Sequence, residues 1–277
     1  MKAGRVHSVI AAGIENPRLL ARWQQEPELL STCGVEPDKL DLDALWKFAG
    51  LTAKVRHNGL RADFPLTFRL LNVAGLEIEV FASYASFRAA AGLRYADTTE
   101  ERTQDLLAFL EHWLDFDRLE HALLWDVMRY ERALSQLSKL DPESNTLHVP
   151  KSIARNAAPR ATSVPRVCGQ IILHEMRCDP REVGQALLQK SPRLENVSPG
   201  VLHFCYWRRG AAAEIHILQL DELGFYLLSL VDGKRTASVL SSLIGGSRRP
   251  ARGFLKALGE LASVGVIAFK ESPRQAL

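Results

Sequence analysis

Four basic residues lie close together near the C-terminus, at a spacing that can bind acidic groups. They are Arg248, Arg249, Arg252 and Lys256. The last two are four residues apart in an expected helix over 250–264, so they share one helix face. This face can contact DNA phosphates and base edges, bind the carboxylates of an acidic peptide, or be a solvated polar face only.

Two expected strands before this helix offer a second way to bind a peptide. Residues 201–207 and 213–220 are rich in apolar and β-branched types and are separated by a turn, which predicts a β-hairpin. A sheet of two or three strands leaves an edge strand with unpaired N–H and C=O groups, which an extended peptide can complete. If 213–220 is that edge, the groove between it and helix 250–264 is a peptide-binding slot.

Motifs of metal sites and of common catalytic centres are absent from the sequence. The four cysteines form no C-x-x-C pair, and the patterns G-x-S-x-G, H-E-x-x-H, G-x-x-x-x-G-K-[ST] and G-x-G-x-x-G do not occur. His112 and His121 each follow a glutamate but are nine residues apart, which is not a helical-face repeat. We therefore expect no cofactor in this chain and no catalytic activity of its own.

The composition is that of a folded globular protein. The 277 residues are 47% hydrophobic and 24% charged, which argues against disordered, collagen-like and filamentous proteins. A net charge of +3 from 35 basic and 32 acidic residues creates no overall field toward nucleic acid or anionic membrane. Because we find neither a membrane-spanning run nor a signal peptide, and the cysteines are scattered, we expect a cytoplasmic protein.

The first half of the chain predicts a series of helices. Asn16 and Pro17 form a typical helix start, and Asp41 and Thr98 can each cap a later helix. Pro65 should bend or restart the helical stretch around it.

The pattern changes after about residue 140. A proline-rich segment with little apolar periodicity is followed by a strand at 167–174, a helix that begins at Asp179-Pro180 and runs to about Gln189, the hairpin, three helices and a last strand at 266–269. Strands, then three helices, then a strand is an order typical of winged-helix domains. We predict an α+β protein with an all-α domain over 1–140, a linker over 141–166, and a winged-helix-like α+β domain over 167–277 whose core spans about 200–270.

A distinctive pattern runs through the last quarter of the chain. It consists of the segment 220–224 (LDELG), the turn 230–236 (LVDGKRT), and a last helix that closes between Leu258 and Val266. In this pattern the chain resembles the PqqD-like peptide-recognition domain, also called the RiPP recognition element. The resemblance implies binding of the leader of a ribosomally made precursor peptide as an added strand, in agreement with the expected sheet edge.

The helical half resembles a second family, that of HvfC and the methanobactin partner proteins. The resemblance rests on the segments 16–19 (NPRL), 56–65 (RHNGLRADFP), 105–110 (DLLAFL) and 124–133 (LWDVMRYERA). Members of that family are obligate partners of multinuclear non-haem iron oxidases that modify precursor peptides. The resemblance thus implies that iron resides in a partner oxidase, which forms a complex with this chain.

Together the two resemblances imply a non-catalytic partner subunit that captures a leader peptide and presents it to the oxidase. Strand residues would supply pairing and pockets, apolar helix residues would line the groove, and two cations would attract leader carboxylates. The residues expected to bind the peptide are Ile215, Ile217, Leu218, Arg252, Phe254, Leu255, Lys256 and Leu258. The alternative function is a winged-helix DNA-binding transcription regulator, which the acidic residues of the same domain disfavour.

Contact with the oxidase is expected at Arg56, Asn58 and Arg61. An equally simple interpretation is that Asn58 and Gly59 end a helix and that the flanking arginines bond its last carbonyls.

Overall fold

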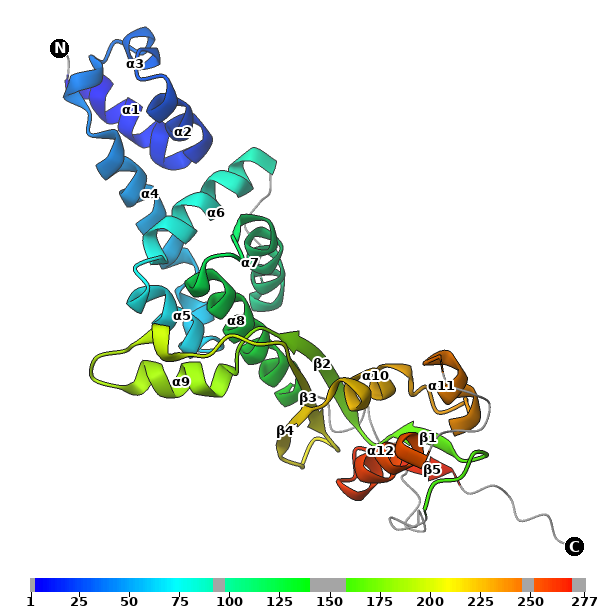
Figure 1. The fold of residues 1–277 in the computed structure, drawn as a ribbon. Coiled ribbons are helices and arrows are strands. Elements are labelled where there is room, and N and C mark those ends of the chain that lie inside the picture. The colour runs from blue at the N-terminus through cyan, green and yellow to red at the C-terminus, as the bar shows by residue number, and fades with distance from the viewer. Residues whose placement is uncertain (1–2, 92–97, 140–157, 246–251, 271–277) are drawn as a thin grey trace, which may run out of the picture. The chain divides into compact units, whose positions relative to one another are not determined.

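The computed structural model describes residues 3–91, 98–139, 158–245 and 252–270 (Figure 1). Helices dominate the N-terminal part, and small antiparallel sheets follow, so the predicted α+β class is confirmed. The chain divides into two compact units, one of residues 1–128 with 181–197, the other of residues 129–180 with 198–277. The boundary at 128 lies inside a helix, not at a linker.

The elements follow the expected order. The helices of the first unit are α1 (Ala3–Glu15), α2 (Pro17–Gln25), α3 (Leu29–Thr32), α4 (Leu42–Arg56), α5 (Pro65–Val73), α6 (Glu77–Ala91), α7 (Thr99–Trp113) and α9 (Pro180–Leu188), with 3-10 turns η1 (Pro37–Lys39), η2 (Asn58–Arg61) and η3 (Leu194–Asn196). Helix α8 (Leu119–Ser138) contributes to both units. The second unit adds β1 (Val164–Val167), β2 (Gln170–Met176), β3 (Leu202–Arg208), β4 (Ile215–Leu220), α10 (Glu222–Leu230), α11 (Ala237–Leu243), α12 (Arg252–Ser263) and β5 (Ile267–Lys270).

Helix starts in the first unit follow local capping chemistry. The side chains of Asn16 and Asp41 accept hydrogen bonds from backbone N–H groups three residues later, at 3.4 and 2.9 Å. Thr98 and Glu101 form a reciprocal capping box at the start of α7. Pro65 is the first residue of α5, so the predicted restart there is confirmed.

Aromatic side chains fill much of the interior of the first unit. The rings of Phe68 and Phe81 stack with centroids 5.8 Å apart, and those of Tyr84 and Phe109 lie 5.4 Å apart. All four are buried. A separate buried cluster around Trp23 joins α1, α2, α3 and α4.

The sheets of the second unit are both antiparallel. Strands β2, β3 and β4 form one sheet in that order, and β1 pairs with β5 in another. The strand expected at 167–174 is confirmed only in part: residues 170–174 belong to β2, but Val167 is the last residue of β1, and the chain passes from one sheet to the other at Gly169. Gly169 has φ +103°, and a Cβ atom there would lie 2.3 Å from the carbonyl oxygen of Arg208. Only glycine fits this crossing.

The expected linker over 141–166 is wrong in its last residues. Residues 140–157 lie outside the described part of the chain, but β1 begins at Val164 and pairs with β5. The prolines suggested a loop, yet Pro165 is tolerated in a strand that has one pairing partner among the described residues.

The three-stranded sheet is covered on both faces. One face packs on the second half of α8, with Phe204, Tyr206 and Met176 buried there. The other face packs on α10, α11 and α12, with Cys205 and Trp207 buried. This two-sided burial explains why β4 carries apolar residues on both faces.

Arg208 ties the end of α8 to the β3–β4 turn. Its Nη1 donates to the carbonyl oxygens of Leu137 and Ser138 at 2.7 and 3.1 Å. Its Nε donates to the carbonyl oxygen of Ala213 at 2.8 Å, and its Nη2 donates to that of Ala211. The cation thus satisfies terminal carbonyls of a helix, where positive charge is favoured, and holds the hairpin against that helix.

In the described part of the chain, no helix combines the length and the apolar character needed to cross a membrane.

We predict that Arg208→Met lowers the free energy of unfolding by about 2 kcal/mol, because four carbonyls lose a charged donor. Arg208→Lys should recover only part of the loss, since an ammonium group cannot reproduce the planar donor set. Arg209→Met, at an exposed neighbouring position, is the matched control and should change stability by less than about 0.5 kcal/mol. Urea unfolding of the full chain measures all three, and equal midpoints for the two Met variants would contradict the prediction.

Candidate functional site

Strand β4 occupies an edge of its sheet. It pairs with β3 from Arg208↔Ile215 to His203↔Leu220, and no other described strand pairs with it. In an antiparallel pair, every second residue directs its N–H and C=O away from the partner. Strand β4 therefore presents a row of backbone donors and acceptors that an added strand can complete.

The side chains of β4 brace this edge from both faces. Ile215 and Ile217 are partly buried against the cluster beneath α8, and Leu218 packs with the opposite cluster. His216 and Gln219 are exposed, and the His216 ring lies 5.1 Å from the Trp207 ring. The three predicted strand residues thus anchor β4 in the core. An added peptide would therefore bind mainly to the backbone N–H and C=O groups of β4.

The predicted residues of α12 divide into two groups. Phe254 and Leu258 are core residues, and Leu258 is 0% exposed, so the expectation that they line a groove at the surface is wrong. Helical spacing predicts an apolar face but cannot distinguish a face that lines a groove from one that is buried. Leu255 is half-buried, whereas Arg252 and Lys256 are exposed.

The cations of α12 differ in their surroundings. Lys256 lies 3.4 Å from Glu260 in an exposed i,i+4 ion pair, which contributes little to stability. Arg252 has no ion pair within the described residues. Arg248 and Arg249, the other members of the basic run, lie outside the described residues.

Helix α10 packs on the face of the sheet formed by β3 and β4, a neighbour that the sequence did not predict for the peptide-binding slot. It packs on β3 and β4, while α12 packs on α10 and β5. Asp221 could have indicated this neighbour from the sequence. It directly follows β4 and caps α10 by accepting a hydrogen bond from the Gly224 N–H at 2.7 Å. A cap placed directly after a strand leaves no loop, so the helix must start beside the strand end.

The opposite edge strand, β2, differs from β4. Arg129 of α8 donates to the Glu175 carbonyl oxygen of β2 at 2.9 Å. No described side chain makes such a bond to a carbonyl of residues 215–220. Of the two edges, β4 is therefore the one at which no described side chain bonds a strand carbonyl.

Two titratable side chains belong to this sheet, the partly buried His174 of β2 and the buried Cys205 of β3. Burial lowers the pKa of His174 to about 4, assisted by the charges of Arg129 and Arg132. Burial raises the pKa of the Cys205 thiol to about 12. Both side chains are therefore uncharged at neutral pH, and the Cys205 thiol is a poor nucleophile.

The expected oxidase-contact residues lie at the end of α4 and in η2. Arg56 is the last residue of α4, and Asn58 is exposed at the start of η2. Arg61 donates to the buried carboxylate of Glu77, and its guanidinium lies 4.8 Å from the centre of the Phe68 ring. Arg61 thus forms an ion pair here, and the alternative in which it bonds helix carbonyls is wrong.

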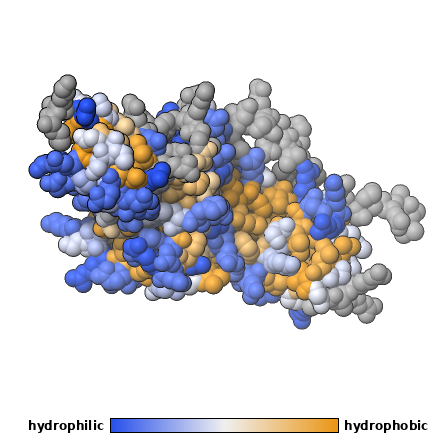
Figure 2. Space-filling view, turned by 90° about the horizontal axis from the view of Figure 1, so that it is seen from above, coloured by the Kyte–Doolittle hydropathy of each residue, from blue (hydrophilic) through white to orange (hydrophobic). Residues whose placement is uncertain are grey.

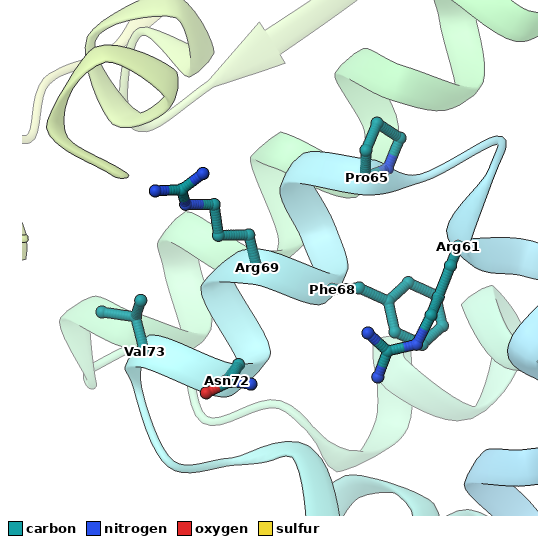
Figure 3. A pocket seen from close by; sticks show the side chains of 6 residues that line it. All are labelled: Arg61, Pro65, Phe68, Arg69, Asn72 and Val73. Carbon is teal, nitrogen blue, oxygen red and sulfur yellow. The ribbon is translucent and has the colours of Figure 1, made fainter. Parts of the chain in front are cut away.

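A hollow of about 530 Å³ opens beside Arg61, along α5 (Figure 3). The residues that line it are Arg61, Pro65, Phe68, Arg69, Asn72 and Val73. Sequence reasoning identified Arg61 but missed Arg69 and Asn72, which the i,i+3 spacing on α5 places on one helix face.

Apolar side chains also reach the surface of the second unit. On the face that Figure 2 shows, hydrophobic side chains in orange interrupt the hydrophilic blue surface. Tyr226 of α10 and Val239 and Leu243 of α11 are among the exposed apolar residues. Val239 and Leu243 share a helix face, but scattered exposure of this kind is ordinary for folded proteins.

Within the ranges that the structure describes, no three His, Cys, Asp or Glu side chains are grouped as a metal site would require. Cys33 is exposed, and the other three cysteines are buried.

Neither the comparison with models of known protein families nor that with curated proteins found a match to this chain.

We predict that the protein loses stability as the pH falls from about 6.5 to 4, in part because of His174. The unfolded chain takes up a proton at its normal pKa of about 6.5, whereas the folded chain resists protonation until about pH 4. The stability that His174 contributes is therefore complete above pH 6.5 and declines by about 3 kcal/mol by pH 4.

His174→Gln should remove this part of the pH dependence in urea unfolding measured from pH 7.5 to 4. His112→Gln changes an exposed histidine and should leave the pH dependence as it is. Identical pH profiles for wild type and His174→Gln would contradict the prediction.

Proposed function

We propose that this chain is a non-catalytic partner subunit that binds the leader of a ribosomally synthesised precursor peptide and presents it to a multinuclear iron-dependent oxidase. The observation that carries the proposal is the outer edge of β4, which pairs with no second strand in the described ranges and is braced by core residues on both faces of its sheet. An extended peptide adds to such an edge through main-chain hydrogen bonds, while side-chain pockets give specificity.

The leader peptide lies along β4 in this proposal, within a domain that is winged-helix-like. Its carboxylates approach the exposed cations Arg252 and Lys256, and its apolar side chains contact Leu255 and the exposed parts of Ile215, Ile217 and Leu218. Phe254 and Leu258 support this surface from below. Leader binding holds the core peptide near the oxidase and so raises its effective concentration at the iron.

The oxidase is assigned from the resemblance of the helical half. Its contact surface includes the turn with Arg56, Asn58 and Arg61, and the iron resides in the oxidase. In this chain, the proposal requires no cofactor, because the chemistry takes place in the partner.

The DNA-binding alternative has less support. Of the described cations on α12, Lys256 is already paired with Glu260, which leaves Arg252. Asp221 and Glu222 are exposed at the start of α10. Specific DNA binding requires several phosphate contacts, which this sparse set does not supply.

We predict that a tagged full-length chain purified from its native host brings down an iron-containing oxidase and a small precursor peptide. Mass spectrometry identifies both, and a metal assay measures the iron. Recovery of duplex DNA in place of the two would overturn the proposal in favour of a transcription regulator.

Proline substitutions test the β4 edge directly. His216 and Gln219 are exposed and differ in parity, so one N–H faces β3 and the other faces away. We make both His216→Pro and Gln219→Pro and measure their melting temperatures. The variant whose N–H faces β3 loses a hydrogen bond to that strand and melts earlier, whereas the variant whose N–H faces outward keeps the wild-type melting temperature. We predict that this variant recovers at least tenfold less precursor peptide, because proline cannot donate to an added strand, but as much oxidase.

The matched control at the same position is threonine, which restores the N–H and suits a strand. His216→Thr or Gln219→Thr should recover as much peptide as the wild-type chain. Undiminished peptide with the well-folded proline variant would show that the peptide does not bind to this edge.

A further inference from the structure

The hollow on α5 combines fixed positive charge with an apolar wall. Figure 3 shows Arg61 beside the Phe68 ring on one side of α5, whereas Arg69 and Val73 project to the other side. Phe68 is buried and forms the floor, whereas Val73 is 40% exposed. A ligand in this hollow therefore meets guanidinium and amide donors and aliphatic and aromatic carbon at the same time.

The charges around the hollow do not balance. The buried carboxylate of Glu77 receives Lys54 Nζ at 2.6 Å as well as the Arg61 guanidinium. Arg69 is exposed and has no ion pair within the described residues. Lys54 and Arg61 thus share one carboxylate, and Arg69 pairs with none among the described residues. Asp63, on the turn before α5, does not line the hollow.

Arg61 is held in place before any ligand arrives. Its ion pair with Glu77 and its position 4.8 Å from the Phe68 ring centre restrict its side chain from two sides. Of its planar set of five N–H donors, only some are used by Glu77, so others remain for a second acceptor. Binding to an ordered guanidinium loses less side-chain entropy than binding to a mobile one.

The free cation, Arg69, favours a carboxylate over a phosphate. A single guanidinium matches a carboxylate in a two-bond, fork-like geometry. A phosphate site normally adds converging backbone N–H groups or several cations, and here half of the lining residues are Pro65, Phe68 and Val73. An acidic side chain next to an apolar one fits both parts of the wall.

Exposed apolar residues also lie on α4. Phe48, Leu51 and Val55 are 52%, 44% and 66% exposed, and their spacing places them on one helix face. Lys54, beside Val55 in sequence, links α4 to the same Glu77 that holds Arg61. The first unit thus exposes an apolar face on the helix that also supplies Lys54.

We infer that the hollow on α5 binds an acidic segment of a partner protein, in which one Glu or Asp side chain pairs with Arg69 and a second one reaches Arg61, while a neighbouring apolar side chain rests on the apolar lining residues. Asn72 donates to one of these carboxylates or to the backbone of the segment. The inference uses no residue of β4, so it stands or falls independently of leader binding.

The test uses short peptides and the full-length chain. The acetylated and amidated tetrapeptide Leu-Glu-Glu-Leu is titrated into isotope-labelled protein, and NMR follows the side-chain signals of Arg61, Arg69 and Asn72. We expect saturable shifts at millimolar concentrations, the range of a weak exposed ion pair with one apolar contact. The peptide Leu-Gln-Gln-Leu should bind at least tenfold more weakly, and so should inorganic phosphate.

Arg69→Gln should weaken binding of the acidic peptide about tenfold, which corresponds to about 1.4 kcal/mol. Arg22→Gln removes another exposed cation of the same unit, on α2, and should leave binding unchanged. Three results would each overturn the inference: no shift with the acidic peptide, equal shifts with both peptides, or unchanged binding to Arg69→Gln. Tighter binding of phosphate would replace it with a phosphate site.

Discussion

The guanidinium group of Arg208 is the interaction on which the second unit depends most. Four backbone carbonyls from two separate segments converge on it, and two of them belong to the last turn of α8. The bonds hold that turn over one face of the sheet, so Phe204 and Tyr206 are buried although the three C-terminal helices cover only the other face. A sheet with both faces covered keeps its edge strand straight and in register.

This arrangement leaves β4, at one edge of the three-stranded sheet, without a second strand partner among the described residues. The faces of the sheet are closed by apolar packing, and β2 gives a carbonyl to Arg129. The edge of β4 keeps its backbone groups, and natural proteins seldom leave such an edge without a purpose. The proposed leader binding follows from this distribution, whereas the choice of an oxidase as partner follows from the resemblance of the helical half.

Local features of the sequence were enough to predict most elements. Asn16, Thr98 and Asp221 cap the helices that their side-chain chemistry indicates, and the hairpin of β3 and β4 forms around the expected turn. Whether 213–220 is an edge strand depends on the strand order, which the sequence did not predict. In the structure β4 is at the edge of its sheet.

Features set by long-range packing could not be predicted. The break at Gly169 depends on the Arg208 carbonyl, 39 residues away in sequence, and no local pattern encodes that crossing. Burial of Leu258 and the covering of the sheet by α8 have the same origin, because an apolar helix face looks alike whether it meets a core or a ligand. The hollow beside Arg61 was missed because Glu77, which fixes that arginine, comes from the next helix.

The close approach of Trp207 to β4 gives the molecule an optical property. Its indole is 6% exposed, donates to the Cys168 carbonyl oxygen at 2.5 Å, and lies beside the exposed ring of His216 on the edge strand. Indole emission responds to nearby polar groups and to their ionisation. The fluorescence of this one tryptophan therefore senses the strand next to it, and a chain in which the other four tryptophans are replaced would report occupancy of the edge without any attached dye.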